Sequence, residues 1–488
     1  MAPDALALAL DAVPLGDDPR RPVDYNARLV AEAVLATPYR EAPGAVRPVP
    51  HAAHGLEPVD GGRRWRLCPD ERLRWSDGTP LRAADLVAGI RDAAVRDRQT
   101  GRFLAEGDTA ARELPDGRVE VHLREAAGFL PALLTLPQFA PLRPGSGAVL
   151  GPYAPDGTGP DGGPRFRRHP HAAGAGALPE RLEFPVVAGL ADAVAAFRAG
   201  RVQATPTTGF DLADTERYAG DPALVSAPVS VFASLEFGRR VPAVRRDPEL
   251  RAAVAAALDR EALAAGTRGL LEAAPAPVAA LLGGDLPAAP EGPRRPPGSG
   301  VGSGVGSGSI SGPGPAAVRA VRAAYAGAGP IEVAHADFVP NGSVVADVCA
   351  RLREVFGLDV RPLALSYAAY VRAALTGDHA LLYTLTTADF PHPAALLGPW
   401  AAGGTYSRTT GFSDPVFDRL FGEACRTTEG AEAAAWLAAE DRWLSLLPRV
   451  PLLRVRAHYL ADPRVRAAGM TASGIIPPLG LGAVAVHR

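Results

Sequence analysis

An acidic side chain near the end of an apolar run is the group in this sequence best placed for chemistry. Ala380–Thr386 has the character of a strand, and Asp389 follows it shortly before Pro391. In an open α/β domain, ligands gather beyond the strand ends, and a carboxylate there can bind an ammonium group through a charge-assisted hydrogen bond. The sequence therefore predicts a ligand-binding role for Asp389. The alternative is that Asp389 only orders the turn before Pro391.

Other side chains near Asp389 complete the predicted site. Phe390 and His392 follow it along the chain, and broad aromatic faces with a polar edge suit the apolar groups of a bound ligand. Three more distant aromatic residues, Tyr383, Trp400 and Tyr406, each fit a ligand cleft and an ordinary core equally well. Trp436 and Trp443, seven residues apart, are predicted to be core. The predicted ligand-binding residues are Asp389, Tyr383, Thr386, Phe390, His392, Trp400 and Tyr406.

Several chemistries are disfavoured by the residues present. The sequence has no lysine, which excludes a P-loop lysine, a Schiff base and a lysine general base. It has no Gly-x-Ser-x-Gly elbow and no metal-ligand spacing, so any catalysis would rely on carboxylates or histidines such as Asp389 and His392. We therefore expect no catalytic residue, no metal ligand and no cofactor.

Three smaller features have simple structural interpretations. Cys68, Cys349 and Cys425 form no paired framework, and the last two are predicted to be buried thiols. Gly157–Gly162 formally matches the dinucleotide fingerprint, but it is embedded in Pro and Gly, so it is predicted to be a loop. His169 and His171 are predicted to be solvent-exposed loop histidines.

Length and charge limit the class of protein. A chain of 488 residues is too long for one compact core, which favours two or three domains. The formal net charge is −2, so no imbalance points to nucleic acid or to an anionic membrane. Ala5–Leu10 is predicted to be a first strand. The basic segment and the cleavage site of an export signal do not accompany it. No stretch of the sequence is long enough to span a bilayer.

The segment Trp65–Ile90 organises the first half of the chain. Trp65 and Leu67, then Leu73 and Trp75, supply the apolar positions of two short extended runs. Ser76-Asp77-Gly78-Thr79-Pro80 predicts a tight turn, because Asp can bond its own backbone, Gly can take positive φ and Pro fixes the exit. Leu86, Val87 and Ile90 then share one helical face.

Patterns in the second half of the sequence predict the helices and strands that position Asp389. Asp247-Pro248-Glu249 is predicted to cap a helix. Residues 286–315 are dominated by Pro, Gly and Ser and are predicted to be a disordered loop. A strand, helix, strand, helix series then leads to Ala380–Thr386. Its members are Ile331–Ala334, Ser343–Phe356, Leu358–Leu363 and Ala368–Leu375.

These motifs, in this order, resemble the family 5 extracytoplasmic solute-binding proteins, the oligopeptide, dipeptide and nickel receptors of ABC importers. The resemblance rests on Trp65–Leu67, the turn Ser76–Pro80, Gly151-Pro152-Tyr153, the helix ending in Asp259-Arg260-Glu261, and Gly411–Asp418. Asp389 matches the position where peptide-binding members carry an aspartate that pairs with the ligand's α-ammonium. Thr386 replaces a tryptophan common in peptide binders.

The resemblance implies an α/β fold of the bilobal type II periplasmic-binding-protein class, in its three-domain peptide-binding variant with a ligand cleft between the lobes. The implied domain I comprises residues 1–45, 166–240 and 456–488, the last as closing strands with one near Gly482–Val486. Domain II would be the insertion 46–165, and domain III would be 241–455, including the loop 286–315.

The implied function is capture of an oligopeptide or amine-bearing metabolite by lobe closure, followed by delivery to an ABC permease. Such a protein would be a monomer and extracytoplasmic, with no nucleic acid partner. A rival interpretation is a cytoplasmic family member reused as an enzyme or binding protein of a biosynthetic pathway. A third, a nickel or haem receptor, would need histidines that converge in the cleft.

Overall fold

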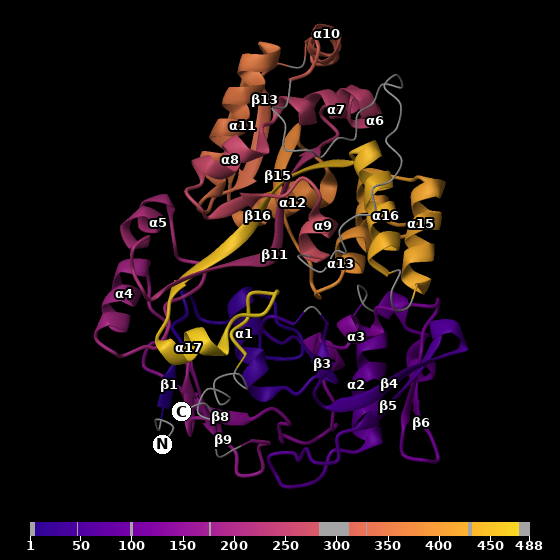
Figure 1. Ribbon diagram of the computed structural model, residues 1–488, viewed down its shortest axis with the longest axis vertical. Coiled ribbons are helices and arrows are strands. Elements are labelled where there is room, and N and C mark those ends of the chain that lie inside the picture. The colour runs from indigo at the N-terminus through magenta and orange to yellow at the C-terminus, as the bar shows by residue number, and fades with distance from the viewer. Residues whose placement is uncertain are drawn as a thin grey trace.

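The computed structural model describes residues 5–45, 47–97, 101–174, 177–282, 312–327, 329–427 and 432–477. It has two lobes, a lower one formed mainly by the first half of the chain and an upper one formed mainly by the second half (Figure 1). Most of the predicted loop 286–315 and the predicted strand near Gly482–Val486 lie outside the described residues. At the end of that loop, Pro315 begins helix α10 (Pro315–Ala324).

The lower lobe contains a four-stranded sheet that takes up the start of the chain. Its order is β1-β10-β9-β8, and β1 pairs in parallel with β10. Helix α1 (Tyr25–Val34) begins at Asp24, whose side chain accepts a hydrogen bond from the N–H of Ala27. The strands are β1 (Ala5–Ala7), β10 (Arg181–Glu183), β9 (Pro164–Arg168) and β8 (Tyr153–Thr158).

The hairpin β8–β9 tests two expectations from the sequence. Gly157 and Thr158 end strand β8, and residues 159–163 turn the chain into β9 without opening a helix. The loop prediction for Gly157–Gly162 is therefore correct only for its second part. The prediction that His169 is exposed is wrong: it is 4% exposed, and its Nε2 lies 2.7 Å from the carbonyl oxygen of Gly151. His171 is exposed, as predicted. The hairpin crosses the predicted domain boundary at residue 165, and that boundary stays a prediction.

A second sheet of the lower lobe holds the organising segment. Its order is β4-β5-β7-β6, covered by helix α2 (Ala83–Arg96). In the predicted turn, the N–H of Trp75 donates to the carbonyl of Thr79 (2.9 Å), and Gly78 has φ +84°. Asp85 accepts from the indole N–H of Trp75 (3.1 Å), which fixes the turn to the helix. The strands are β4 (Ala53–Val59), β5 (Arg64–Pro69), β7 (Val119–His122) and β6 (Ala111–Glu113).

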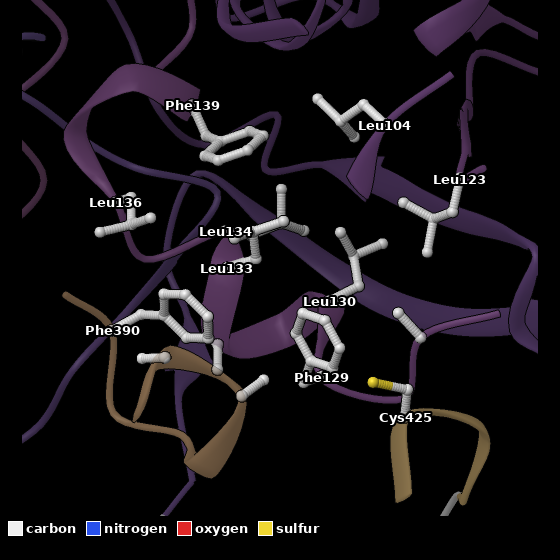
Figure 2. Close-up of a cluster of buried hydrophobic side chains, with 14 of the residues drawn as sticks. Leu104, Leu123, Phe129, Leu130, Leu133, Leu134, Leu136, Phe139, Phe390 and Cys425 are labelled. Carbon is white, nitrogen blue, oxygen red and sulfur yellow. The ribbon is translucent and has the colours of Figure 1, made fainter. Parts of the chain in front are cut away.

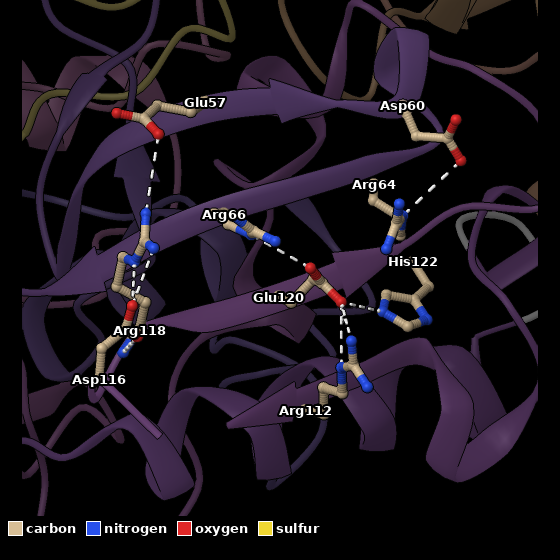
Figure 3. Close-up of polar contacts among 9 residues, drawn as sticks. All are labelled: Glu57, Asp60, Arg64, Arg66, Arg112, Asp116, Arg118, Glu120 and His122. Atoms are coloured by element: carbon tan, nitrogen blue, oxygen red, sulfur yellow. Dashed lines mark hydrogen bonds and ion pairs between the residues drawn. The ribbon is translucent and has the colours of Figure 1, made fainter. Parts of the chain in front are cut away.

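A carboxylate on this sheet is fully covered by cationic partners (Figure 3). Glu120 on β7 is 0% exposed and accepts hydrogen bonds from Arg66 (3.2 Å) and Arg112 (2.6 Å). The Nε2 of His122 lies 2.9 Å from the same carboxylate. Although burial by itself would raise the pKa of Glu120, these hydrogen bonds outweigh it and lower the pKa to about 2.

The upper lobe is built on a six-stranded sheet of order β12-β16-β11-β15-β13-β14. Strands β13 (Ile331–Ala336), β14 (Val360–Leu365) and β15 (Leu381–Thr387) are parallel to one another. Helix α11 (Asn341–Phe356) and helix α7 (Pro248–Ala257) cover one face of the sheet. Helix α12 (Tyr367–Thr376) lies on the other face, beside β13 and β14. The predicted series of elements before Asp389 is thus confirmed.

Helices pack around the sheet and complete the upper lobe. The predicted cap is confirmed, since Asp247 accepts hydrogen bonds from the N–H groups of Glu249 and Leu250. The remaining helices are α6 (Pro242–Arg246), α8 (Arg260–Gly266), α9 (Pro277–Leu282), α13 (Pro393–Leu397), α14 (Thr405–Thr410), α15 (Pro415–Arg426) and α16 (Glu432–Leu446). Strand β12 is Leu271–Ala273.

Two long antiparallel strands join the lobes. These are β11 (Leu224–Phe237) and β16 (Arg449–Leu460), whose pairing shifts register between Pro228 and Phe232. Their lower ends lie beside helices α4 (Leu190–Arg198), α5 (Leu212–Tyr218) and α17 (Pro463–Ala468) (Figure 1). The side chain of Arg454 bonds the carbonyls of Val229 (2.9 Å) and Ala280 (2.8 Å) next to the shift. The register shift marks where the ribbon passes between the lobes.

A hydrophobic core also runs from one lobe to the other. Phe129, just before helix α3 (Leu130–Leu133), stacks on Phe390 with ring centroids 6.0 Å apart. Figure 2 shows Phe129 and Leu130 of the lower lobe facing Phe390 and Cys425 of the upper lobe. The N–H of Gly128 donates to the carbonyl of Cys425 (2.7 Å). The lobes therefore make direct apolar and backbone contact beside β15.

Candidate functional site

The carboxyl ends of the three parallel strands form the edge where Asp389 lies. Strands β13, β14 and β15 end at Ala336, Leu365 and Thr387, and their pairing brings these ends to one side of the sheet. The segments that follow carry apolar side chains exposed to solvent: Phe338 (45% exposed), Val339 (57%) and Tyr367 (70%). An acidic group and an open apolar surface thus share one sheet edge.

Asp389 is held on a rigid frame. Its neighbours in sequence, Ala388 and Phe390, are 0% and 4% exposed, and the N–H of Ala388 donates to the carbonyl of Ser230 (2.8 Å). Asp389 itself is exposed. A carboxylate at a fixed position on a sheet edge has the placement that recognition of an ammonium group requires.

Three predicted residues converge on a buried arginine that the sequence did not single out. Arg449 on β16 is 4% exposed and donates to the hydroxyl oxygen of Thr386 (2.6 Å) and to the carboxylate of Glu236 (2.5 Å). Its guanidinium carbon lies 4.5 Å from the ring centre of Tyr406 and 5.1 Å from that of Trp400. Thr386, Trp400 and Tyr406 therefore belong to one cluster.

The electrostatics of this cluster favour an ionised arginine. Burial alone would lower the pKa of Arg449, but the adjacent Glu236 carboxylate outweighs it and holds the pKa above its ordinary value. Since Glu236 neutralises Arg449, the pair adds no net charge. It serves to fix the two aromatic rings, which lie 5.0 Å apart.

A small cavity adjoins the cluster. Its volume is about 30 Å³, enough for one or two water molecules. Thr386, Trp400, Arg449 and Glu440 line it, together with apolar side chains. Burial raises the pKa of Glu440 to about 7, although it accepts hydrogen bonds from the N–H groups of Val278 (2.6 Å) and Ala279 (3.0 Å).

The other predicted residues lie elsewhere. Phe390 and His392 are part of the contact between the lobes, where His392 lies 5.3 Å from the ring of Phe129 and its Nε2 is 2.8 Å from Glu432. Tyr383 is 1% exposed and packs in the core on the α11 side of the sheet, opposite to Thr386. Trp436 and Trp443 are buried as predicted.

Sequence reasoning missed Arg449, Glu236, Phe338 and Tyr367. The first two are ordinary strand residues in sequence, and only their pairing across β11 and β16 reveals the ion pair. Phe338 and Tyr367 could have been found from the sequence, because each follows shortly after a predicted strand. The same position after a strand identified Asp389.

Among the residues that the structure describes, no group of three or more His, Cys, Asp or Glu side chains is placed to hold a metal ion. Cys349 and Cys425 are buried, as predicted, and burial raises the pKa of the Cys425 thiol to about 12. Within the same residues, no helix combines the length and apolar character of a membrane span.

The fold is a two-lobed α/β arrangement whose lobes are joined by β11 and β16. Comparison with family models places it further. Residues 47–408 match the bacterial extracellular solute-binding proteins, family 5, so the chain belongs to that family, as its motifs predicted. No curated protein sequence matches the chain.

Solved structures share the fold over nearly the whole chain. The oligopeptide-binding protein OppA of Burkholderia pseudomallei is similar, with 18% identity, TM-score 0.74 and 97% of each chain covered. The Escherichia coli murein tripeptide binding protein MppA has 14% identity and TM-score 0.71, covering 98% of this chain and 97% of its own. Listeria monocytogenes OppA, solved bound to peptide, has 15% identity and TM-score 0.71, covering 98% of each chain. The predicted peptide-binding fold is confirmed.

Proposed function

We propose that this protein captures a short peptide, or a comparable metabolite with a free amine, and delivers it to an ABC permease. The observation that carries the proposal is the exposed Asp389 at the carboxyl ends of β13, β14 and β15. The family is one of extracellular solute-binding proteins, and similar structures include one with peptide bound. The protein would act outside the cytoplasm as a monomer.

The surroundings of Asp389 suit a ligand with an amine at one end and apolar groups beyond it. The carboxylate would accept a charge-assisted hydrogen bond from the amine, a contact that typically contributes about 1.5–3 kcal/mol. Phe338, Val339 and Tyr367 offer apolar surface on the same edge. The half-buried Tyr406, fixed by Arg449, would border the next part of the site, whereas Trp400 is 2% exposed and supports Tyr406 from behind.

A ligand that touches both lobes would stabilise the closed arrangement. Only β11 and β16 connect the sheets of the two lobes in the described chain, so hinge motion would concentrate at their register shift. Closure driven by the ligand follows from contacts that exist only when both lobes meet it.

The proposal is tested by screening short peptides of mixed sequence by thermal shift and titrating the best ligand calorimetrically. Asp389→Ala should weaken binding by roughly tenfold or more, from loss of the charged hydrogen bond. Asp192→Ala, which removes an exposed carboxylate from α4, should bind as the wild type does. Equal affinity of the Asp389→Ala protein for every ligand found would reject the assignment.

A further inference from the structure

A cavity of about 320 Å³ lies under helix α12. This volume is at the lower end of the range of small-molecule sites, roughly 300–1,000 Å³. The cavity is an open groove between α12 and strands β13 and β14, near the amino-terminal end of β15. Its lining runs from His379 and Ala380, just before β15, to Leu365, the last residue of β14, and does not include Asp389.

The groove exists because α12 presents small side chains to the sheet. Ala369, Arg372, Ala373 and Thr376 line it, and their spacing places them on one helical face. A helix that packs on a sheet normally fills this face with Leu or Val, yet none of the α12 residues is buried. The floor is apolar, formed by Ala334, Leu363 and Leu365.

The charged groups at the rim differ in how they are paired. Arg240 bonds both carboxylates, Asp378 at 2.9 Å and Glu332 at 3.4 Å. The guanidinium group of Arg372, in contrast, has no hydrogen bond or ion pair with any residue that the structure describes, although the carbonyl oxygen of Arg372 accepts from Thr376. Among the charged side chains that line the groove, the guanidinium group of Arg372 is thus the one left to pair with a ligand. A guanidinium group suits a carboxylate.

A buried histidine adds a polar group without a hydrogen bond. His379 lines the groove, is 3% exposed, and has no hydrogen-bond partner on either ring nitrogen among the described residues. Its nearest charged neighbour is Glu236, with Nε2 to Oε1 3.9 Å. Burial lowers the pKa of His379, so at neutral pH the ring offers one donor and one acceptor. Buried polar groups without partners are rare and call for an explanation.

We propose that this groove binds a small monocarboxylate with a flat apolar body, whose acid group pairs with Arg372 and whose body lies on Ala334, Leu363 and Leu365. The site is independent of the amine site at Asp389. Its occupant is a free small molecule and not a part of the transported ligand.

The test uses naphthoate as the probe, with naphthamide and naphthylmethylamine as neutral and cationic matches, each titrated calorimetrically into the full chain. Naphthoate should bind with one-to-one stoichiometry and at least about tenfold more tightly than naphthamide, because the amide loses the charged hydrogen bond. Absence of naphthoate binding, or tighter binding of the amine, would overturn the proposal.

Three variants locate the bound probe. Ala373→Leu should fill the groove and abolish naphthoate binding, whereas Ala368→Leu, on the exposed face of the same helix, should leave it unchanged. Arg372→Gln, a surface change that leaves the fold intact, should weaken naphthoate binding about tenfold and leave naphthamide binding unchanged. Asp389→Asn should not alter naphthoate affinity. Loss of naphthoate binding in Asp389→Asn, or unchanged binding in Arg372→Gln, would contradict the assignment.

Discussion

A single buried arginine organises the predicted aromatic residues of the site. Arg449 is surrounded by Thr386, Glu236, Trp400 and Tyr406, and its charge is compensated by Glu236 alone. Two buried charges in contact are costly to separate, because either one left alone is desolvated without a partner.

Removing the arginine should therefore be more harmful than removing both charges. We expect Arg449→Met to lower the free energy of unfolding by about 3–5 kcal/mol, since Glu236 stays buried without its partner. The double change Glu236→Gln with Arg449→Met should recover most of that loss. Urea denaturation followed by tryptophan fluorescence measures both, with Arg319→Met on α10 as the exposed control. A single variant as stable as the wild type would refute this account of the pair.

The buried carboxylate of Glu120 predicts a specific pH dependence. Its pKa is about 2 in the folded protein against an ordinary value of 4.5 in the unfolded chain, so its interactions stabilise the fold fully at pH values above 4.5. That contribution is lost as the pH falls from about 4.5 towards 2. At pH 7, Glu120→Gln should cost about 2–3 kcal/mol of unfolding free energy.

Near pH 3 the difference between wild type and Glu120→Gln should fall to about half, since part of the wild-type carboxylate is then protonated in the unfolded state. Denaturation at the two pH values gives the comparison. Glu71→Gln, an exposed change on the same lobe, should show no such trend. A difference that stays constant with pH would show that the arginines do not hold Glu120 ionised.

At the scale of elements, the sequence predicted what depends on neighbouring residues. The turn and helix of Trp65–Ile90, the cap at Asp247 and the helices and strands before Asp389 depend on local spacing, and all are present. His169 was misjudged because its partner, the carbonyl of Gly151, is brought to it by the hairpin. Glu236 and Arg449 are 213 residues apart in sequence, so no local pattern could join them.

One contact between elements requires a glycine, because there is no room for a side chain. The N–H of Gly128 donates to the carbonyl of Cys425 at the end of α15, and a Cβ on Gly128 would come within 2.5 Å of the backbone oxygen of Thr427. Because that neighbour is backbone, the added methyl group would push the two segments apart. This glycine therefore permits the lobes to meet at this point.

Gly128→Ala should open the contact and lower stability by about 1–3 kcal/mol, the usual cost of overpacking. Small-angle X-ray scattering should show a larger radius of gyration, and denaturation should show the loss. Gly147→Ala is the matched control, since its Cβ would meet no atom within 4 Å. If both variants match the wild type in radius and stability, the contact does not hold the lobes together.

At the scale of the molecule, the two lobes combine two kinds of contact. The ribbon of β11 and β16 connects them and contains a register shift, while Phe129 and Phe390 bring apolar surface together beside it. Asp389 lies next in sequence to Phe390, so a ligand held by this carboxylate would sit beside the surface where the lobes meet. Under the proposed function, ligand recognition and lobe closure would take place at the same location.

The most direct test compares the best peptide ligand with its N-acetylated form, each titrated calorimetrically into wild type and Asp389→Asn. If Asp389 binds the ligand amine, acetylation and the substitution should each weaken binding, but their effects should not add. The coupling energy should be about 1.5–3 kcal/mol. Additive effects, or an acetylated peptide that binds wild type as tightly as the free amine does, would contradict the role assigned to Asp389.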